Sequence, residues 1–183
     1  MPNQNKLDKT YLKMAEAWAE MSHAKRKKVG CLIVKDERII SDGFNGTPSG
    51  FNNECEEILY TCDEHDYASK DDSGPDHSFI SLKDDLTRFE DEEWQLDKDK
   101  EKFFKLKTKP EVLHAESNAL MKLARSTNSS EGATVYCTYS PCFDCAKLII
   151  QSGVKRLVYN ETYRKREGLD LLKKAGVEIV KYE

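Results

Sequence analysis

The chain has 183 residues, a length typical of one domain. It carries 29 basic and 33 acidic side chains, a formal net charge of −4, which disfavours bulk binding to nucleic acid or to an anionic membrane surface. Hydrophobic residues make up 38% of the chain, enough for one core, and no apolar run approaches the roughly 20 residues that span a bilayer. The N-terminus lacks the apolar stretch of a signal peptide, so we expect a cytoplasmic protein. Its six cysteines then indicate metal binding or burial rather than disulfides.

The chain begins with helical periodicity and continues with two short runs typical of strands. Apolar side chains recur at helical spacing through residues 6–22, which predicts an amphipathic first helix. A basic run, Lys25–Lys28, follows it. The runs Val29–Val34 and Arg38–Phe44 predict two strands joined as a hairpin. Residues 45–50, rich in Gly, Asn, Pro and Ser, predict a turn region after the hairpin.

The stretch from about 55 to 110 fits neither pattern and is rich in Asp, Glu and Lys. Because a structureless loop of that length is rare inside a compact domain, we expect an insert with structure of its own. One or two exposed acidic helices are predicted there from apolar side chains at helical spacing, namely Phe79, Leu82, Leu86 and Phe89. The chain is therefore interpreted as a single domain, 1–183, with a polar acidic insert.

From about residue 113 onward, helices and strands alternate. Crossover connections of this kind imply parallel strands, so the sheet is expected to combine the antiparallel hairpin with parallel strands. Gly153 and Gly176 lie just after two of the helices, where a left-handed cap favours glycine. The predicted segments are the helix His114–Arg125, the strand Ala133–Thr138, the helix Cys142–Ser152, the strand Val154–Tyr159, the helix Arg164–Ala175 and the strand Val177–Val180.

Side chains at the start of two predicted helices indicate a metal centre. A catalytic zinc takes three protein ligands and leaves one position open for water. His114 opens the first helix, and Cys142 and Cys145, three residues apart, place both sulfurs on one side of the next. Glu116 is then the acid–base group, which takes a proton from the water and returns it to a departing nitrogen.

The C-x-x-C pair by itself has other interpretations. In a cytosolic chain it is also typical of a redox pair or of half a structural zinc site. A structural site needs a fourth ligand, which Cys137 or a residue of the insert would supply. The joint pattern H-x-E followed by P-C-x-x-C, with Pro141 before the first cysteine, is the signature of the zinc-dependent nucleobase deaminases.

Several further segments carry a resemblance to a known family: Lys25–Cys31, Gly43–Gly50, Leu113–Ala119, Ser140–Lys147, and Tyr163-Arg164 with Glu167–Asp170. Through them the sequence resembles the cytidine/deoxycytidylate deaminase superfamily, and within it the deoxycytidylate (dCMP) deaminases. The resemblance covers about residues 6–54 and 110–183, and the long acidic insert departs from it.

This resemblance implies a fold and an activity. The fold is α/β, with three layers (α/β/α) and a five-stranded mixed sheet in the order 2-1-3-4-5 that carries helices on both faces. The activity is the zinc-dependent hydrolytic deamination of dCMP to dUMP and ammonia, which feeds thymidylate synthesis. Another deaminase of the superfamily, acting on cytidine, cytosine or tRNA adenosine, is the nearer alternative, and a non-catalytic zinc module is the more distant one.

The implied strand order brings several loops to the sheet edge where the zinc is expected, outside the carboxyl ends of the strands. A nucleotide monophosphate brings a dianion that needs fixed donors, and basic loop residues are the candidates, with solvated surface as the alternative. Asn45 would read the sugar or base edge, and the alternative is a left-handed turn residue before Gly46. The predicted substrate-binding residues are Arg26, Lys28, Asn45, Ala115, Ser140, Tyr163 and Arg164.

The resemblance also suggests regulation and assembly. Allosteric control by dCTP and dTTP is common among dCMP deaminases, with Mg²⁺ entering only with the triphosphate. The loop expected to contribute to it contains Gly46, Thr47, Ser49 and Gly50. Family members usually form dimers or larger rings, so we expect a homo-oligomer that binds a small nucleotide, and neither nucleic acid nor a membrane.

The remaining cysteines have weaker signals. Cys31 and Cys137 lie within strand runs and are expected to be small buried hydrophobic residues. A second, structural zinc site in the insert is the other hypothesis, and its ligands would be Cys55, Cys62, His65 and His77.

Overall fold

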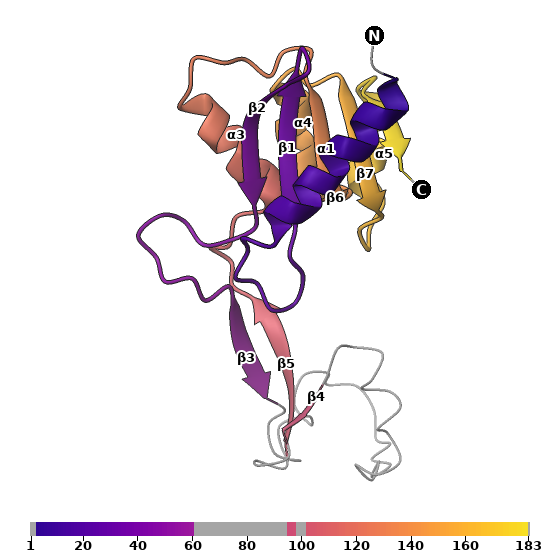
Figure 1. Ribbon diagram of the computed structural model, residues 1–183. Helices are drawn as coiled ribbons and strands as arrows, with labels where there is room; N and C mark the ends of the chain where they lie inside the picture. Colours follow the sequence, from indigo (N-terminus) through magenta and orange to yellow (C-terminus); the bar gives the residue numbers. More distant parts are fainter. Residues whose placement is uncertain (1–2, 61–94, 98–101, 183) are drawn as a thin grey trace, which may run out of the picture. The chain divides into compact units, whose positions relative to one another are not determined.

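The computed structural model describes residues 3–60, 95–97 and 102–182 (Figure 1). The chain divides into two compact units, one made of residues 1–55 with 110–183 and the other of residues 56–109. The second unit covers nearly the same residues as the acidic insert expected at about 55–110. That the two units form a single domain stays a prediction.

The first unit is built on a five-stranded mixed sheet in the order β2-β1-β6-β7-β8. β1 pairs antiparallel with β2 and with β6, while β6, β7 and β8 are parallel. Counted within this sheet alone, the order is 2-1-3-4-5, which confirms the expected topology. The strands are β1 (Gly30–Lys35), β2 (Arg38–Phe44), β6 (Thr134–Tyr139), β7 (Arg156–Glu161) and β8 (Glu178–Lys181).

Helices cover both faces of this sheet, as expected for three layers (Figure 1). One face carries α1 (Gln4–Ala19), and the other carries α3 (Ala115–Ala124), α4 (Phe143–Gln151) and α5 (Glu167–Lys174). None of the helices in the described part of the chain is both long and apolar enough to cross a membrane.

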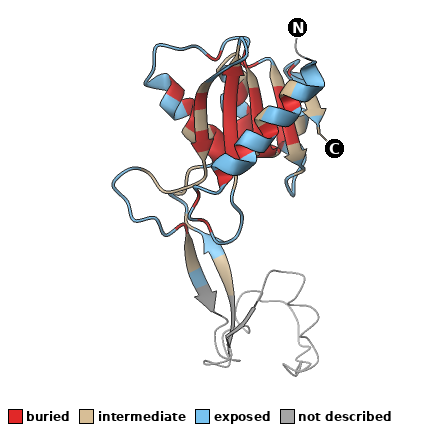
Figure 2. Ribbon diagram, viewed as in Figure 1, coloured by how far each residue is buried: buried red, intermediate tan, exposed pale blue. Residues whose placement is uncertain are grey.

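The central strands of the sheet are largely buried (Figure 2). Their side chains form two core clusters, because successive side chains of a strand point to opposite faces. In β1, Cys31 and Ile33 join the cluster under α3, α4 and α5. Leu32 and Val34 join the cluster under α1, together with the buried Leu12. Full burial of one such aliphatic side chain is worth about 1.5–3 kcal/mol, so these residues help to hold α1 on the sheet.

The predicted helices and strands of the first unit are confirmed, with ends that shift by at most three residues. The hairpin turn consists of Asp36 and Glu37, whose φ values of 49° and 59° are those of a two-residue type I′ turn. Gly153 and Gly176 both have φ of 77°, which confirms the left-handed caps after α4 and α5. The largest shifts, of three residues each, are at α1, which ends at Ala19 rather than at residue 22, and at α5, which begins at Glu167 rather than at Arg164.

The second unit contains strands that were not predicted. β3 (Glu56–Tyr60), β4 (Gln95–Asp97) and β5 (Lys102–Thr108) form an antiparallel sheet in the order β3-β5-β4. Glu57 and Lys107 lie opposite each other in this sheet and form an ion pair at 3.0 Å. The strands are rich in charged residues, which obscured their pattern in the sequence. The acidic helix predicted around residues 79–89 lies outside the described residues.

A buried ion pair connects α1 to the sheet. Both guanidinium Nη atoms of Arg156 donate to the two carboxylate oxygens of Asp8, each at 2.8 Å. The Tyr136 hydroxyl and the Gln4 side chain donate to Oδ1 of Asp8 at 2.8 and 2.9 Å. Burial alone would raise the pKa of Asp8, but the hydrogen bonds from Arg156, Gln4 and Tyr136 outweigh it and hold that pKa below its ordinary value.

Replacing Asp8 with asparagine should leave the Arg156 guanidinium without its buried counterion and lower the free energy of unfolding by about 3 kcal/mol. Because the pKa of Asp8 is lower in the folded than in the unfolded state, its carboxylate stabilises the fold fully above about pH 4. This contribution is lost as the pH falls through the folded-state pKa. Urea unfolding between about pH 7 and pH 3 should therefore show the difference between wild type and Asp8→Asn shrinking at the acid end.

The matched control is Glu178→Gln, since Glu178 is the second partner of Arg156, at 3.0 Å, with a side chain that is 63% exposed. Loss of an exposed pair should cost less than about 1 kcal/mol. Equal losses in the two variants, or a loss in Asp8→Asn that does not depend on pH, would contradict the assigned role of the pair.

Candidate metal centre

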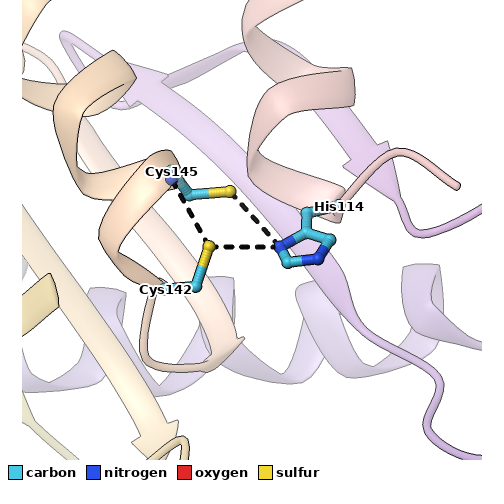
Figure 3. A group of neighbouring side chains, drawn as sticks. All are labelled: His114, Cys142 and Cys145. Carbon is cyan, nitrogen blue, oxygen red and sulfur yellow. Dashed lines mark hydrogen bonds between the residues drawn. The ribbon is translucent and has the colours of Figure 1, made fainter. Parts of the chain in front are cut away.

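Three side chains gather where two helices begin at one edge of the sheet. His114 is the N-cap of α3, Cys142 is the N-cap of α4, and Cys145 lies in the first turn of α4. Nδ1 of His114 lies 3.4 Å from Sγ of Cys142 and 3.5 Å from Sγ of Cys145 (Figure 3). All three atoms lie within 4.8 Å of one another, and the structure brings no other such group of His, Cys, Asp or Glu together among the residues it describes.

These distances fit a tetrahedral zinc ion. Zinc–sulfur bonds of about 2.3 Å and zinc–nitrogen bonds of about 2.0 Å separate a nitrogen and a sulfur ligand by about 3.5 Å at the tetrahedral angle. One nitrogen and two sulfurs leave a fourth position open, as in a catalytic site. Cys137, the alternative fourth ligand, is not part of the group. Both Cys142 and Cys145 are free thiols, so the group is not a disulfide.

The two thiols compete for a single negative charge. A hydrogen bond from the Cys145 thiol, followed by those from His114 and from the Cys145 backbone N–H, lowers the pKa of Cys142 to about 4. The same hydrogen bond to Cys142, together with burial, raises the pKa of Cys145 well above its ordinary value. A divalent cation between the sulfurs removes this conflict, because it stabilises both thiolates at once. The charge balance of the group therefore favours a bound cation.

Glu116 lies in the first turn of α3, two residues after His114, and only 4% of it is exposed. Burial raises the pKa of Glu116 above its ordinary value, although a hydrogen bond from its own backbone N–H and the charge of His114 oppose this. A raised pKa brings the carboxyl group closer to neutral pH, which suits acid–base chemistry.

Two glycines allow neighbouring elements to pack closely against the ligand-bearing segments. A Cβ atom on Gly43 of β2 would collide with the backbone of α3 at Ala115 and lie 2.6 Å from the backbone nitrogen of Ala119. One on Gly168 of α5 would collide with the Pro141 carbonyl and lie 2.8 Å from the carbonyl oxygen of Cys142. Close backbone contact therefore fixes where both helices begin.

The loops expected to bind substrate lie at the same edge of the sheet. Gly30 at the start of β1 pairs with Phe44 at the end of β2, and Tyr139 at the end of β6 pairs with Glu161 at the end of β7. Arg26 and Lys28 precede β1, while Tyr163 and Arg164 follow β7. The strand pairing thus confirms the expected convergence of these loops, and their contact with a substrate stays a prediction.

Several of these residues have partners in the structure. The Lys28 ammonium group forms an ion pair at 3.0 Å with Glu20, the residue that follows the last turn of α1. Ser140 is buried, and its hydroxyl accepts a hydrogen bond from the Tyr163 backbone N–H at 2.8 Å, which holds the loop after β7. Ala115, also buried, is the first residue of α3, where backbone N–H groups have no partner within the helix.

The structure adds a contact that the sequence did not indicate, between Lys27 of the basic run and Tyr139. The Lys27 ammonium group lies over the ring of Tyr139, 4.7 Å from its centroid. Tyr139 ends β6 and stands three residues before the metal-ligand candidate Cys142. This cation–π contact orients the basic run toward the ligand-bearing segment. No local signal in the sequence pairs a lysine at 27 with a ring at 139.

Both polar atoms of the Asn45 side chain form hydrogen bonds with the main chain. Its Oδ1 accepts from the Val29 N–H at 2.8 Å, and its Nδ2 donates to the Lys27 carbonyl at 2.8 Å. Among the residues that the structure describes, those other than glycine with positive φ are Asp36 and Glu37. The alternative interpretation of Asn45 as a left-handed turn residue is therefore wrong.

The loop after Asn45 is tied to the segment that leads into α3. Gly46 exchanges two backbone hydrogen bonds with Leu113, at 3.1 and 2.9 Å. The Thr47 hydroxyl donates to the Asn52 carbonyl at 2.6 Å, while Ser49 and Gly50 are exposed. Gly50 has φ of 93°, which favours glycine there.

The other cysteines divide into two groups. Cys31 and Cys137 are buried opposite each other on β1 and β6, which confirms the expectation. Cys55 is also buried. The other three residues of the hypothetical second zinc site lie outside the described part of the chain: Cys62, His65 and His77.

Comparison with known proteins identifies relatives over most of the chain. A family model of the cytidine and deoxycytidylate deaminase zinc-binding region matches residues 5–161. Deoxycytidylate deaminase of Enterobacteria phage T4 is 38% identical over 174 residues, which cover 93% of this chain and 86% of that protein. Deoxycytidylate deaminase of Mycobacterium phage D29 is 31% identical over 152 residues, covering 83% of this chain and 92% of that protein.

A solved structure is also similar. The dCMP deaminase of cyanophage S-TIM5, crystallised in complex with dCMP and dUMP, is 35% identical to this chain and superposes with a TM-score of 0.68. The similarity covers 97% of both chains.

If His114, Cys142 and Cys145 hold the metal, replacing any one of them with alanine should remove one equivalent of zinc from the purified protein, because a site with three protein ligands binds weakly once one is lost. Elemental analysis of protein purified without chelators measures this. His23→Ala and Cys31→Ala are matched controls outside the group, and they should keep their zinc. Wild-type protein without zinc, or full occupancy in all three ligand variants, would contradict the assignment.

Proposed function

The chain belongs to the cytidine and deoxycytidylate deaminase family, and we propose that within it this protein hydrolyses dCMP to dUMP and ammonia. The observation that carries the proposal is the set of His114, Cys142 and Cys145, with the buried Glu116 two residues after the histidine. Relatives named deoxycytidylate deaminase, which match over most of their own length, support dCMP as the substrate. The similar structure in complex with dCMP and dUMP supports the same substrate and product.

In the proposed mechanism Glu116 moves the protons. Zinc, when bound, would act as a Lewis acid and lower the pKa of the water molecule it binds to about 7. The Glu116 carboxylate accepts a proton as the water oxygen attacks C4 of cytosine, and it delivers that proton to N3. Glu116 then transfers the second proton of the water to the departing amino nitrogen, so that one water is consumed and one ammonia leaves. Burial of Glu116 keeps this exchange away from bulk solvent.

The 5′-phosphate of dCMP requires donors at the edge of the sheet. The proposed donors are Arg26, Lys28 and Arg164, assisted by Ser140 and Tyr163, with Asn45 and Ala115 near the nucleoside. The support is their place in loops that leave or enter the strands at that edge. The ion pair between Lys28 and Glu20 lowers the net charge that Lys28 offers to a phosphate. An arginine presents a rigid fork of donors that matches a phosphate, so the two arginines are expected to contribute more.

Replacing Glu116 with glutamine should lower dCMP turnover about 10²- to 10⁴-fold, because the amide cannot carry the proton. The zinc content should stay at the wild-type level, since Glu116 lies outside the ligand group. Steady-state kinetics and elemental analysis of the same preparation test both points. Glu111→Gln, an exposed glutamate just before α3, is the matched control and should keep full activity. Near-wild-type turnover of Glu116→Gln would remove Glu116 from the mechanism.

Phosphate recognition should make dCMP a far better substrate than deoxycytidine. Each charge-assisted hydrogen bond is worth about 1.5–3 kcal/mol, so two of them should raise kcat/KM for dCMP on the order of a hundredfold or more. Arg26→Ala and Arg164→Ala should each reduce that preference and leave the turnover of deoxycytidine nearly unchanged.

Arg38→Ala is the matched control for both arginines, because Arg38 is exposed and begins β2 at the opposite edge of the sheet. It should keep the preference of the wild type. Equal kcat/KM values for dCMP and deoxycytidine in the wild-type protein would show that the basic loops do not bind the phosphate.

The regulatory and assembly expectations stay predictions. We propose, from the family alone, that dCTP and dTTP with Mg²⁺ act at the loop that contains Gly46, Thr47, Ser49 and Gly50. Homo-oligomerisation and a cytoplasmic location are likewise predictions, and the second zinc site of the insert stays the less favoured hypothesis.

A further inference from the structure

Neighbouring lysines of the basic run contact different parts of the molecule. The Lys28 ammonium group forms its ion pair with Glu20 at 3.0 Å, beside the end of α1. The Lys27 ammonium group instead lies over the ring of Tyr139, 4.7 Å from its centroid. Tyr139 is the last residue of β6, and the metal-ligand candidate Cys142 follows three residues later. Of these two lysines, Lys27 is therefore the one that contacts the ligand-bearing segment.

The two lysines also differ in the positive charge that they offer to a ligand. The carboxylate of Glu20 largely neutralises the charge of Lys28. Among the residues that the structure describes, Lys27 has no carboxylate partner. An aromatic ring attracts a cation through its quadrupole and does not neutralise it. Because Lys27 is also exposed, its charge is available to an anion and is held at a defined place.

The ring under Lys27 is itself fixed from the neighbouring strand. Tyr139 lies opposite Glu161 in the parallel pairing of β6 with β7. Burial, followed by a hydrogen bond to Glu161, raises the pKa of Tyr139, so the phenol stays neutral and donates to that carboxylate. Ser140, the next residue, donates its backbone N–H to the Glu161 carbonyl at 2.8 Å. The position of the ring therefore follows from its attachment to β7 and does not depend on Lys27.

The loop after β7 brings a second basic residue to the same segment. The backbone N–H of Tyr163 donates to the hydroxyl of the buried Ser140 at 2.8 Å, and Arg164 follows Tyr163 directly. The end of β6 is thus contacted both by Lys27 and by the loop that contains Arg164. A phosphate dianion has oxygens enough to accept charge-assisted hydrogen bonds from more than one cation. Two cations that meet at one segment suit such a ligand.

We propose that Lys27 binds the phosphate of the nucleotide and that Tyr139 is its positioning residue. This inference rests on the proposed function and adds Lys27 to the phosphate donors given there. Tyr139 acts through Lys27, because a lysine already held over a ring loses less conformational freedom when the phosphate binds. The group that Lys27 recognises is the phosphate dianion of a nucleoside monophosphate, so its effect is confined to ligands that carry one.

The main test removes the charge of Lys27 and compares two substrates that differ only in the phosphate. For Lys27→Met, kcat/KM for dCMP should fall about tenfold, mainly through KM, because one charge-assisted hydrogen bond is lost. For deoxycytidine, kcat/KM should stay within about twofold of wild type, since that substrate has no phosphate to accept the bond. Lys27→Arg keeps the charge and should keep most of the preference for dCMP. Lys35→Met, which removes a charge at the other end of β1, is the matched control and should change neither substrate.

Replacements of the ring test the positioning role of Tyr139. Tyr139→Phe keeps the ring without the hydroxyl, so it should keep most of the preference for dCMP. Tyr139→Leu removes the ring and should lower that preference about two- to fivefold, less than Lys27→Met does, because the ammonium group is still present. In the double variant Lys27→Met/Tyr139→Leu, the preference should be no lower than in Lys27→Met alone. Zinc content at the wild-type level in each variant shows that the nearby metal centre is intact.

A binding measurement tests the inference without turnover. By calorimetry, dUMP should bind Lys27→Met about tenfold more weakly than wild type, whereas deoxyuridine should bind both proteins equally. Because Lys27 is exposed, Lys27→Met should fold like the wild type. If Tyr139→Leu does not fold, Tyr139→Met takes its place as the variant without a ring, and the same two- to fivefold loss of the preference is expected for it, again about that of one cation–π contact.

Each outcome separates the role of Lys27 from the proposed function. An unchanged preference for dCMP in Lys27→Met, or equal losses on dCMP and deoxycytidine, would overturn the inference while dCMP deamination stands. A preference that falls in Lys27→Met and stays at the wild-type level in the variant without a ring would overturn the positioning role of Tyr139. A wild-type protein that does not deaminate dCMP would overturn the proposed function, and binding of dUMP against deoxyuridine would still decide whether Lys27 recognises the phosphate.

Discussion

The antiparallel pairing of β1 with β6 is the constraint on which the arrangement of the site depends. Because β1 runs against β6 and β7, its beginning lies beside their ends. The basic run before β1 and the ligand-bearing turn after β6 consequently share one edge of the sheet. Had β1 been parallel to β6, the basic run would lie a strand length away, about 20 Å for six residues.

The metal centre concentrates negative charge, and local structure compensates for it. The Cys142 thiolate caps α4 and accepts a hydrogen bond from the Cys145 backbone N–H at 3.5 Å. Helix N-termini, which carry partial positive charge, stand behind both Glu116 and the two sulfurs. The hydrogen bonds within the group lower the pKa of Cys142 and raise that of Cys145, so the two thiols do not ionise equally. A cation among these groups would stabilise both thiolates.

The buried ion pair and the metal-ligand candidates lie on different faces of the sheet. The helices α3 and α4, which present the ligand candidates, cover one face, and α1 covers the other. Under α1 the buried pair of Asp8 and Arg156 connects the helix to β7, and Tyr136 joins it from β6. The alternation of side chains along β6 and β7 keeps this pair apart from the thiols.

The sequence by itself determined the features that depend on neighbouring residues. Helical periodicity, the glycine caps at 153 and 176, and the two halves of the zinc signature are local patterns, and the structure places each of them where expected. The order of the strands was expected through the family resemblance, not through local pattern. The strands β3, β4 and β5 were missed, because charged residues hide their alternation.

Only the tertiary structure decided the partners of individual polar side chains. Asp8 and Arg156 are 148 residues apart, and nothing local distinguishes them from other charged residues. Turn-forming residues surround Asn45 in the sequence, yet its side-chain amide forms hydrogen bonds with the backbone of residues 27 and 29. Such contacts depend on strand register and on the path of loops, which bring distant groups within about 3 Å only after the sheet has formed. A pattern in the sequence indicates which residues can carry the chemistry, and packing decides what each of them touches.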